Sequence, residues 1–324
     1  MTTETEATTA GSSSGAKGEI HERFQDDGCY GPLNILSFEE AQEAWKEVKE
    51  ELSVSSSYRK EESAYSRFKL HLFLPRVAAI AHHPKLVEAV QQALGSKDVL
   101  LWSSDVNIKP ASSDGFFAMH QDSTYAGLVP STQCLTAWVA LSDPVGEAEG
   151  CLSFYRQSHK LGQIPHQEKK DGHNMLSLGQ YIDSQELASV AERKGISSVS
   201  VDSMDWVTIP LRAGQATLHS FYCIHQSGPN KSSISQDRVG LALRYMTSDV
   251  RQSKVAAREM VTVVSGPPPT QFDIEPRLPR QPIDDDIARG RQVRAEAMRR
   301  EEKNYFDQST TVQSYASTNL PSEE

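Results

Sequence analysis

The chain has 324 residues, a formal net charge of −10, and 38% hydrophobic against 23% charged residues. These shares are typical of a soluble globular protein that forms one large domain or two small ones. The acidic balance argues against nucleic-acid partners, because phosphate binding needs a surplus of Lys and Arg. It also argues against anionic membrane surfaces, and no apolar run approaches the roughly 20 residues of a membrane helix.

Both ends of the chain differ in composition from its middle. Residues 1–19 are rich in Thr, Ser, Gly and Glu, and we expect a disordered tail because such a segment cannot offset the entropy of ordering. Residues 20–264 are expected to form the folded domain. Residues 265–324 begin Pro-rich and continue into the charged stretch Asp284–Phe306, which predicts a solvated helix in a C-terminal tail.

Two features point to the compartment. The first residues have neither the basic nor the apolar segment of a secretory signal. The cysteines form no CxxC pair, so we interpret them as reduced thiols. They are Cys29, Cys134, Cys151 and Cys223. Both features favour a cytoplasmic protein.

Two helices are expected before residue 98. The segment from Ser37 to Leu52 opens with a capping box, because Glu40 lies three residues after Ser37, and its apolar residues follow at helical spacing. The segment from Pro84 to Leu94 begins with a proline that suits the first turn and is followed by Gly95, which suits a helix end.

After residue 98 the pattern changes to short β-like runs separated by turn residues. Many short strands that follow helices predict a mainly β, α+β fold, namely a β-sandwich or jelly roll with helices on one face. The expected strands are Val99–Ile108, Thr136–Ser142, Cys151–Tyr155, Val199–Val201, Trp206–Ile209, Ala216–Cys223 and Val239–Met246.

The strongest short signal for chemistry is the tripeptide His120-Gln121-Asp122. Residues two apart in a strand point to the same side, so an imidazole and a carboxylate would project together. His225 is our candidate for a third ligand from a distant strand. Two His and one carboxylate leave three positions open on an octahedral ion, which suits iron(II) with a bidentate co-substrate and O2. His219 shares the parity of His225 and competes with it, but we interpret His219 as a packed strand histidine.

An oxo-acid co-substrate would need a cation in the site, because a buried carboxylate is costly unless it is paired. Arginine serves best, since its planar fork meets both carboxylate oxygens. Arg238 follows His225 by thirteen residues, on what we expect to be the neighbouring strand. Arg244 shares its side of that strand by parity and is the second candidate.

Together these residues resemble the phytanoyl-CoA dioxygenase family of iron and 2-oxoglutarate oxygenases. The matching stretches are HQDSTYAGL (from His120), TAWVALSD (from Thr136), GCLSFYRQSHKLGQIPH (from Gly150), HQSGPNKSS (from His225) and DRVGLALRY (ending at Tyr245). The resemblance covers roughly residues 24–250. It implies a double-stranded β-helix, which is a distorted, cupin-like jelly roll.

The resemblance also implies roles for single residues. Iron(II) would be held by His120, Asp122 and His225. The 2-oxoglutarate co-substrate would be bound by Trp138, Ser227, Arg238 and Lys109.

The resemblance further implies an oxidoreductase. Such a dioxygenase uses O2 to oxidise, and most often hydroxylates, an unactivated C–H bond of a small metabolite, with release of succinate and CO2. We expect a substrate of secondary metabolism. Related halogenases replace the metal carboxylate with Ala or Gly, so Asp122 favours oxygenation over halogenation. Relatives have PGSH where this chain has YRQSH, from Tyr155 to His159, and we expect the turn before Ser158 to differ.

Substrate contacts are expected around the metal strand, although such residues are more often packing or surface residues. The candidates are Gln121, Tyr125, Trp102 and Phe117. The segment Gln163–Gln180 is a candidate lid. We expect a monomer or homodimer that binds a small molecule. Two alternatives stay open: a non-catalytic jelly-roll protein that keeps a metal for structure or recognition, and a cupin-like metal enzyme that works without 2-oxoglutarate.

Overall fold

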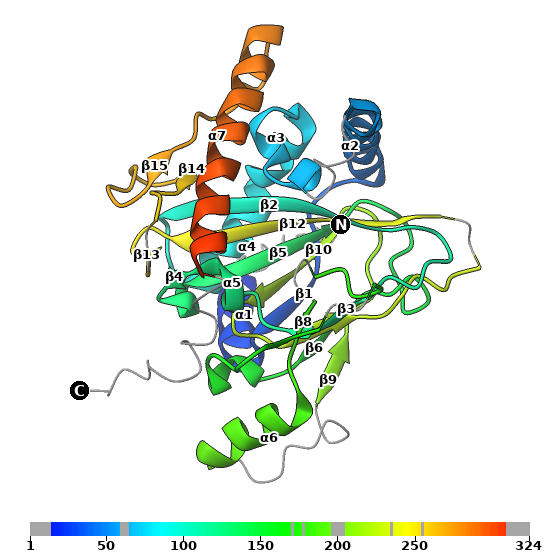
Figure 1. Cartoon of the computed structure of the whole chain (residues 1–324), viewed down its shortest axis with the longest axis vertical. Helices are drawn as coiled ribbons and strands as arrows, with labels where there is room; N and C mark the ends of the chain where they lie inside the picture. Colours follow the sequence, from blue (N-terminus) through cyan, green and yellow to red (C-terminus); the bar gives the residue numbers. More distant parts are fainter. Residues whose placement is uncertain are drawn as a thin grey trace, which may run out of the picture.

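Two β-sheets face each other in the computed structural model (Figure 1), which describes residues 14–58, 65–169, 172–176, 179–195, 205–233, 236–253 and 256–308. The larger sheet has the strand order β1-β10-β5-β12-β2-β14-β15 and the smaller has the order β3-β11-β6-β9. The larger sheet contains β1 (Cys29–Asn34), β2 (Val99–Lys109), β5 (Cys134–Ala140), β10 (Gln215–Ser220), β12 (Arg238–Thr247), β14 (Met260–Ser265) and β15 (Asp273–Ile274). The smaller sheet contains β3 (Phe117–His120), β6 (Leu152–Tyr155), β9 (Trp206–Thr208) and β11 (His225–Ser227).

Helices and short elements surround these sheets. The helices are α1 (Ser14–Asp27), α2 (Phe38–Tyr58), α3 (Pro75–Ala81), α4 (Pro84–Leu94), α5 (Ser123–Ala126), α6 (Ser184–Arg193) and α7 (Asp284–Gln308). Two strand pairs lie outside the main sheets: β4 (Leu128–Val129) with β13 (Arg251–Gln252), and β7 (Gln167–Glu168) with β8 (Gln180–Tyr181). Single 3-10 turns occur at Tyr65–Arg67, Leu70–Leu72, Ser131–Gln133 and Ser158–Leu161.

Alternation along β5 shows why the larger sheet has two apolar layers. Leu135 and Val139 belong to the core cluster that includes the buried faces of α2, α3 and α4. Trp138 points the opposite way and joins Phe154 of the smaller sheet in a second cluster. Because both faces of the strand are covered, all seven residues of β5 are buried. The expected jelly roll is therefore confirmed, but its helices do not lie on one face alone, because α6 joins Met119 and Tyr155 of the smaller sheet in another apolar cluster.

Local signals place several element boundaries where they were expected, although α2 continues past Leu52 to Tyr58. In α2 the capping box forms, since Glu40 N donates to Ser37 Oγ at 3.1 Å and Ser37 N donates to Glu40 Oε2 at 2.8 Å. Helix α4 runs from Pro84 to Leu94, and Gly95 ends it at φ 66°. In the segment from Tyr155 to His159, where the sequence departs from the family pattern, Gln157 adopts φ 63°. This is a left-handed conformation that favours glycine.

Three expectations need correction or stay outside the structure. Strand β10 ends at Ser220 rather than Cys223, because the chain turns there and Cys223 N donates to Ser220 O at 2.9 Å. Helix α1 begins at Ser14, so disorder is wrong for the last residues of the expected N-terminal tail. Residues 1–13 and the expected strand Val199–Val201 lie outside the described residues.

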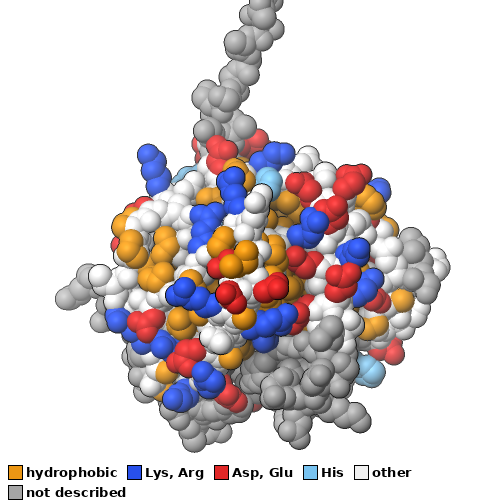
Figure 2. Space-filling model, turned by 90° about the horizontal axis from the view of Figure 1, so that it is seen from above, with side chains coloured by type: hydrophobic (Ala, Val, Ile, Leu, Met, Phe, Trp, Pro, Cys, Tyr) orange, Lys and Arg blue, Asp and Glu red, His pale blue; other side chains and the backbone are white. Residues whose placement is uncertain are grey.

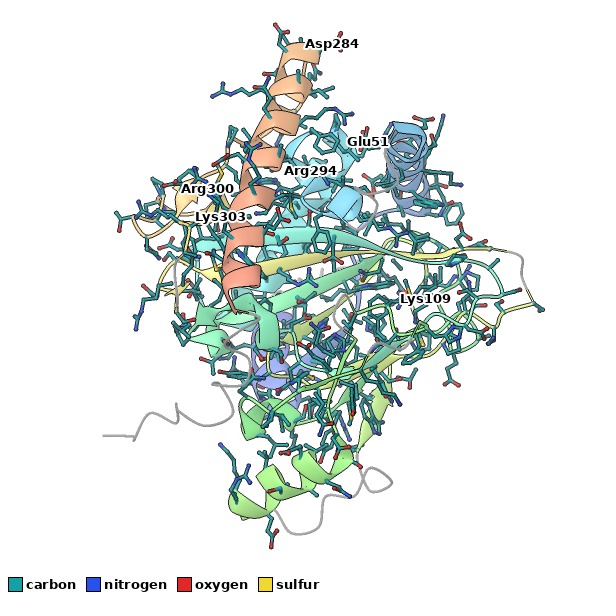
Figure 3. All side chains as sticks on the ribbon, in the orientation of Figure 1. Glu51, Lys109, Asp284, Arg294, Arg300 and Lys303 are labelled. Carbon is teal, nitrogen blue, oxygen red and sulfur yellow. The ribbon has the colours of Figure 1, made fainter. Side chains whose placement is uncertain are left out.

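The charged C-terminal segment forms the expected helix, but one face of it is buried. In Figure 3, α7 runs from Asp284 past Arg294 to Lys303. A Cβ on Gly290 would lie 2.0 Å from Leu72 O, so the glycine allows the helix to approach the 3-10 turn Leu70–Leu72. Ala297 is 1% exposed. The predicted solvated helix therefore has one buried face, because it packs against the domain.

A buried ion cluster lies under this helix. Lys69 Nζ lies 2.8 Å from Glu275 Oε1 and 3.1 Å from Glu301 Oε1, and Lys69 and Glu275 side chains are fully buried. Lys69 also donates to Trp102 O at 2.6 Å. Burial of such charges is tolerated only when they are paired, so the cluster ties α7 to the edge of the larger sheet.

The described surface shows mixed charge. Figure 2, which looks onto the molecule from above, shows Lys and Arg side chains interspersed with Asp and Glu. Within the described residues, no helix is both long and apolar enough to cross a membrane.

We predict that Glu301 makes stability depend on pH. Burial raises the pKa of Glu301 to about 7, against an ordinary value of 4.5. The folded state thus holds this proton more tightly, and the resulting stabilisation is lost as the pH rises through about 7. Between about pH 5 and pH 8, wild type should lose roughly 1–3 kcal/mol of stability relative to Glu301→Gln. Unfolding midpoints of both proteins across this range measure the difference, and parallel curves would contradict the prediction.

Candidate metal centre

Three predicted ligands lie together between the sheets. His120, Asp122 and His225 each offer one ligand atom, and these three atoms lie within 4.8 Å of one another. All three residues are buried, at 4%, 2% and 5% exposure. The rings of His120 and His225 lie with their centroids 4.1 Å apart. The structure therefore brings together residues separated by more than a hundred positions in the sequence.

Strand pairing and a turn position the ligands. Strand β11 pairs antiparallel with β3, and His225 is the partner of His120. The expectation that the whole tripeptide lies in one strand is wrong, because β3 ends at His120 and Asp122, at φ −66° and ψ −26°, is the residue immediately before helix α5. The turn into α5, rather than strand parity, brings the carboxylate beside the imidazoles.

Backbone carbonyls orient both imidazoles. His120 Nδ1 donates to Ala118 O at 2.7 Å, and His225 Nδ1 donates to Cys223 O at 3.0 Å. Each ring therefore presents Nε2 for a metal, an arrangement common among metal-binding histidines. Burial lowers the pKa of both imidazoles, which favours the neutral form that binds metals.

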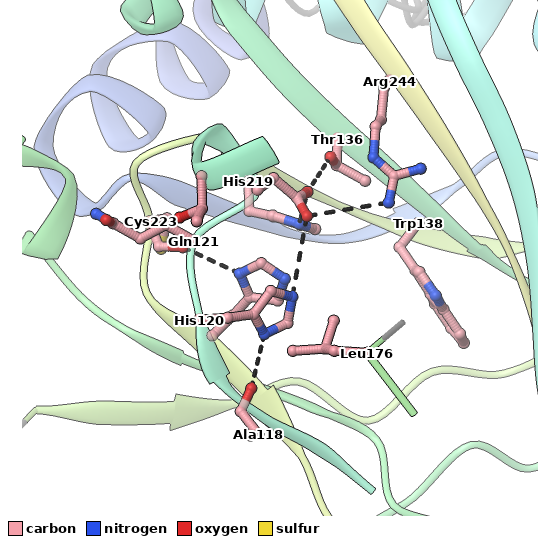
Figure 4. Close-up of polar contacts among 12 residues, drawn as sticks. Ala118, His120, Gln121, Thr136, Trp138, Leu176, His219, Cys223 and Arg244 are labelled. Carbon is pink, nitrogen blue, oxygen red and sulfur yellow. Dashed lines mark hydrogen bonds and ion pairs between the residues drawn. The ribbon is translucent and has the colours of Figure 1, made fainter. Parts of the chain in front are cut away.

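The two oxygens of Asp122 have different surroundings (Figure 4). Thr136 Oγ1 donates to Oδ2 at 2.5 Å, and His219 Nε2 lies 3.4 Å from the same oxygen. Oδ1 lies 3.9 Å from His120 Nε2 and 3.9 Å from Arg244 Nη2. Burial alone would raise the pKa of Asp122, but Arg244 and His219 outweigh it and hold that pKa well below the ordinary range. The carboxylate is thus ionised, with Oδ1 turned toward His120.

His219 lies next to the group of His120, Asp122 and His225 but is not part of it. It comes from β10 in the larger sheet, is 1% exposed, and its ring centroid lies 4.4 Å from that of His225. Its ring also packs 5.2 Å from Phe154. These contacts suit a packed histidine beside Asp122, in keeping with our interpretation.

A buried arginine marks the opposite end of the site. Arg238 begins β12 and is 1% exposed. None of its three guanidinium nitrogens has a hydrogen-bond partner among the described residues. Its guanidinium stacks on Trp138 at 4.4 Å from the ring centroid, and burial lowers the pKa of Arg238 to about 10. An unpaired buried cation is costly, so this one is prepared for an anion.

Gly240 makes room for the tryptophan. A Cβ on Gly240 would lie 1.7 Å from Trp138 Cζ2. The absent side chain lets the indole lie flat against β12, beside Arg238. Trp138 Nε1 also donates to Asn107 Oδ1 at 3.0 Å, which sets the position of the ring.

Lys109 and Ser227 complete this end of the site. Lys109 is the last residue of β2 and, in Figure 3, it lies between the two sheets. Its Nζ donates to Ser227 Oγ at 2.6 Å and to Ser227 O at 3.2 Å. Burial, reinforced by Arg238, lowers the pKa of Lys109 to about 6. The four residues predicted to bind the co-substrate therefore lie in one buried region.

The predicted substrate contacts differ from one another in their surroundings. Gln121 is fully buried, and its amide donates to Gly162 O at 2.8 Å and to Tyr222 O at 2.7 Å, so its polar atoms are used inside the fold. Trp102 is 3% exposed, and its Nε1 donates to Glu259.

Phe117 is half-buried, with Lys109 Nζ 5.4 Å from its ring centroid. It therefore borders the co-substrate region through Lys109. The side chain of Tyr125 lies outside the described residues.

The expected lid segment is attached to the edge of β3. Met175 N donates to Phe116 O at 2.8 Å, and Ala118 N donates to Asn174 Oδ1 at 3.4 Å. Figure 4 shows Leu176 near the ring of His120. His166, which belongs to the same segment, is held beside the metal strand, because its Nε2 accepts from Gln121 N at 2.9 Å.

Sequence reasoning missed four residues of the site: Thr136, Asp105, Asn107 and Gly240. A signal was available for two of them, because Asp105 and Asn107 are polar residues that alternate with the apolar Val106 and Ile108 along one strand. Nothing local marks Thr136 or Gly240, whose roles depend on the side chains that approach them.

This geometry defines a class of protein before any comparison. Two imidazoles and one carboxylate in a jelly roll are the ligand set of non-haem iron oxygenases, and the donor types fit iron(II). The family follows from sequence: residues 25–238 match the phytanoyl-CoA dioxygenase (PhyH) family, so the chain belongs to it. It is an iron(II)- and 2-oxoglutarate-dependent oxidoreductase.

Known proteins resemble the chain along most of its length. The ectoine dioxygenase of Bordetella parapertussis is 25% identical over 247 residues, which cover 71% of this chain and 76% of that protein. Among solved structures, the non-heme monooxygenase ThoJ in its apo form has a TM-score of 0.73 at 29% identity, and the match covers 91% of this chain and 99% of ThoJ. The epimerase SnoN, in complex with Fe3+, alpha ketoglutarate and nogalamycin RO, has a TM-score of 0.57 at 19% identity. That match covers 83% of this chain and 98% of SnoN, and it shows the shared fold.

We predict that Asp122→Ala lowers the affinity for iron(II) by more than about a hundredfold, since even residues that only support a ligand account for 10–100-fold. Anaerobic metal titration measures the affinity. The matched variants are His225→Gln, which should be as damaging, and His219→Gln, which should cost far less. Loss of iron in His219→Gln together with normal binding in His225→Gln would show that the third ligand is His219.

Proposed function

We propose that this chain hydroxylates an unactivated C–H bond of a small metabolite, with iron(II) on His120, Asp122 and His225 and with 2-oxoglutarate as co-substrate. One observation carries the proposal. The three ligand atoms lie within 4.8 Å of one another, in the same buried layer as Arg238, whose guanidinium has no hydrogen-bond partner among the described residues. A chelating oxo-acid requires a metal site and, for its second carboxylate, a cation such as Arg238 that has no other partner.

The chain's own residues have separate tasks in this reaction. The two histidines and Asp122 hold the metal on one side only, so its other positions stay open. Arg238 binds the far carboxylate of the co-substrate through its planar fork, and Ser227 is placed by Lys109 to add a hydrogen bond. When bound, iron(II) with 2-oxoglutarate and O2 supplies the oxidant, and the co-substrate leaves as succinate and CO2.

Two residues keep the co-substrate region apolar. Trp138 stacks on the guanidinium of Arg238, and Phe117 packs against Lys109 Nζ. Exclusion of water strengthens the interaction between a carboxylate and its cations. Binding at this end therefore fixes the co-substrate and leaves the target carbon to be placed by the residues around the metal.

Retention of Asp122 supports oxygenation rather than halogenation. The carboxylate occupies the ligand position that would otherwise be free for a halide, and Thr136 holds it there. The alternative of a non-catalytic metal protein, or of a cupin-like enzyme without 2-oxoglutarate, gives the unpaired Arg238 no task.

The proposal extends to a monomer or homodimer in the cytoplasm that acts in secondary metabolism. Four free, buried cysteines support a reducing compartment. A net charge of −10 supports a partner that is neither nucleic acid nor an anionic membrane. A metabolite screen scored by succinate release tests the reaction. Ectoine belongs in the screen, since curated relatives are ectoine dioxygenases.

We predict that Arg238→Met weakens 2-oxoglutarate binding by roughly 2–4 kcal/mol, because the carboxylate would lose its buried partner. The weak visible band of the anaerobic complex with iron(II) and 2-oxoglutarate serves as the readout. Arg212→Met, which breaks the exposed ion pair with Asp143, is the control and should leave the affinity unchanged. Near-normal affinity in Arg238→Met would assign the carboxylate to Arg244.

We predict that 2-oxoglutarate binds more weakly as the pH rises from about 6 to about 8. The pKa of Lys109 is lowered to about 6, so the amine is mostly neutral above that pH. A carboxylate beside it favours the charged form, and binding then takes up a proton, which costs up to about tenfold in affinity per pH unit. Calorimetry in buffers of different ionisation enthalpy measures the uptake. Lys109→Met should abolish it, and equal uptake in both proteins would exclude Lys109.

A further inference from the structure

A line of polar side chains crosses the inner face of the larger sheet and has no task in the mechanism so far. Arg244 of β12 donates through Nη1 to Oδ1 of Asp105 on β2. Its other terminal nitrogen, Nη2, lies 3.9 Å from Asp122 Oδ1. In Figure 4 a dashed line from the Arg244 guanidinium marks this contact, on the side of Thr136.

The position of this pair leaves it little freedom. Strands β2 and β12 are adjacent, and Ala242 and Asp105 are partners in their register. The side chains of Arg244 and Asp105 are only 12% and 9% exposed. A buried ion pair persists only when both charges are satisfied, so the arginine is held at Asp105 while its second nitrogen faces the metal carboxylate.

Asn107 continues the line in a defined orientation. Its Nδ2 donates to Asp105 Oδ2 at 2.5 Å, and its Oδ1 accepts from Trp138 Nε1 at 3.0 Å. Since an ionised carboxylate only accepts and an indole only donates, the amide has one way to satisfy both partners. Asp105 therefore joins the arginine beside the metal to the tryptophan beside Arg238.

We propose that Arg244, held in place by Asp105, is a positioning residue that fixes the carboxylate of Asp122 with Oδ1 toward His120. The inference rests on the proposed function, because it takes Asp122 as an iron ligand.

Three groups act on that carboxylate from different directions. Thr136 and His219 lie at Oδ2, and Arg244 lies at Oδ1. Together they oppose rotation of the carboxylate about its bond to Cβ. Arg244 differs from Arg238 in having a carboxylate of the chain as its partner, so it supports the metal ligand and leaves the co-substrate to Arg238.

Cobalt(II), which reports its ligand set through its visible absorption, is the probe. It is titrated into the full-length protein without 2-oxoglutarate. Arg244→Gln and Asp105→Asn should each raise the Kd for cobalt(II) about tenfold or more and change the visible spectrum. The double variant should be no worse than the more damaging single variant, because the two residues act as one unit.

Arg212→Gln is the matched control, since it breaks an exposed arginine–aspartate pair, and it should behave as wild type. Arg244→Lys keeps the charge without the fork and should recover part of the affinity. Unfolding midpoints identify variants that fail to fold, and Asp105→Asn, which has nearly the same shape as wild type, then carries the test.

The outcomes separate this inference from the proposed function. Wild-type Kd and spectrum in both variants, with cobalt lost in Asp122→Ala, would overturn the positioning role and leave the metal site intact. Normal cobalt binding in Asp122→Ala as well would overturn the proposed function. Normal cobalt binding with a weaker 2-oxoglutarate complex in Arg244→Gln would make Arg244 a co-substrate contact, which also contradicts the inference.

Discussion

The antiparallel pairing of β11 with β3 is the interaction on which the site depends. It makes His225 the partner of His120, and so joins residues far apart in the chain. Strand β11 has only three residues, but it lies between β3 and β6, and both neighbours hold its register. A shift of one residue would turn the imidazole of His225 to the other face of the sheet. The metal site is therefore a consequence of sheet register.

Charge is arranged in opposite senses at the two ends of the site. The metal end carries the ionised carboxylate of Asp122, and its charge is balanced by Arg244, which Asp105 holds in place. The other end carries Arg238 and Lys109 without a carboxylate of their own among the described residues. A dianion that chelates a cation at one end and offers a carboxylate at the other matches this arrangement. The fold tolerates the cost of the buried Arg238 cation because binding removes it, whereas Lys109 stays mostly neutral above about pH 6 until a carboxylate binds beside it.

Features set by neighbouring residues could be predicted from the sequence, and features set by distant contacts could not. Pro84 and Gly95 determine the ends of α4 locally, and the ligand residues were found by spacing together with family resemblance. The docking of α7 depends on Lys69 and Glu301, which are far apart in sequence and pair only after folding. The role of Gln121 depends likewise on carbonyls from two distant loops. Residues beside the metal were therefore easier to identify than the residues that hold them.

The most direct test of this account is a crystal structure of the anaerobic complex with iron(II) and 2-oxoglutarate, with data collected at the iron absorption edge. The account predicts one anomalous peak bound by His120 Nε2, His225 Nε2 and an oxygen of Asp122. It also predicts that the far carboxylate of the co-substrate lies on Arg238. An iron atom bound by His219 in place of His225, or a co-substrate carboxylate on Arg244 with Arg238 still unpaired, would contradict it.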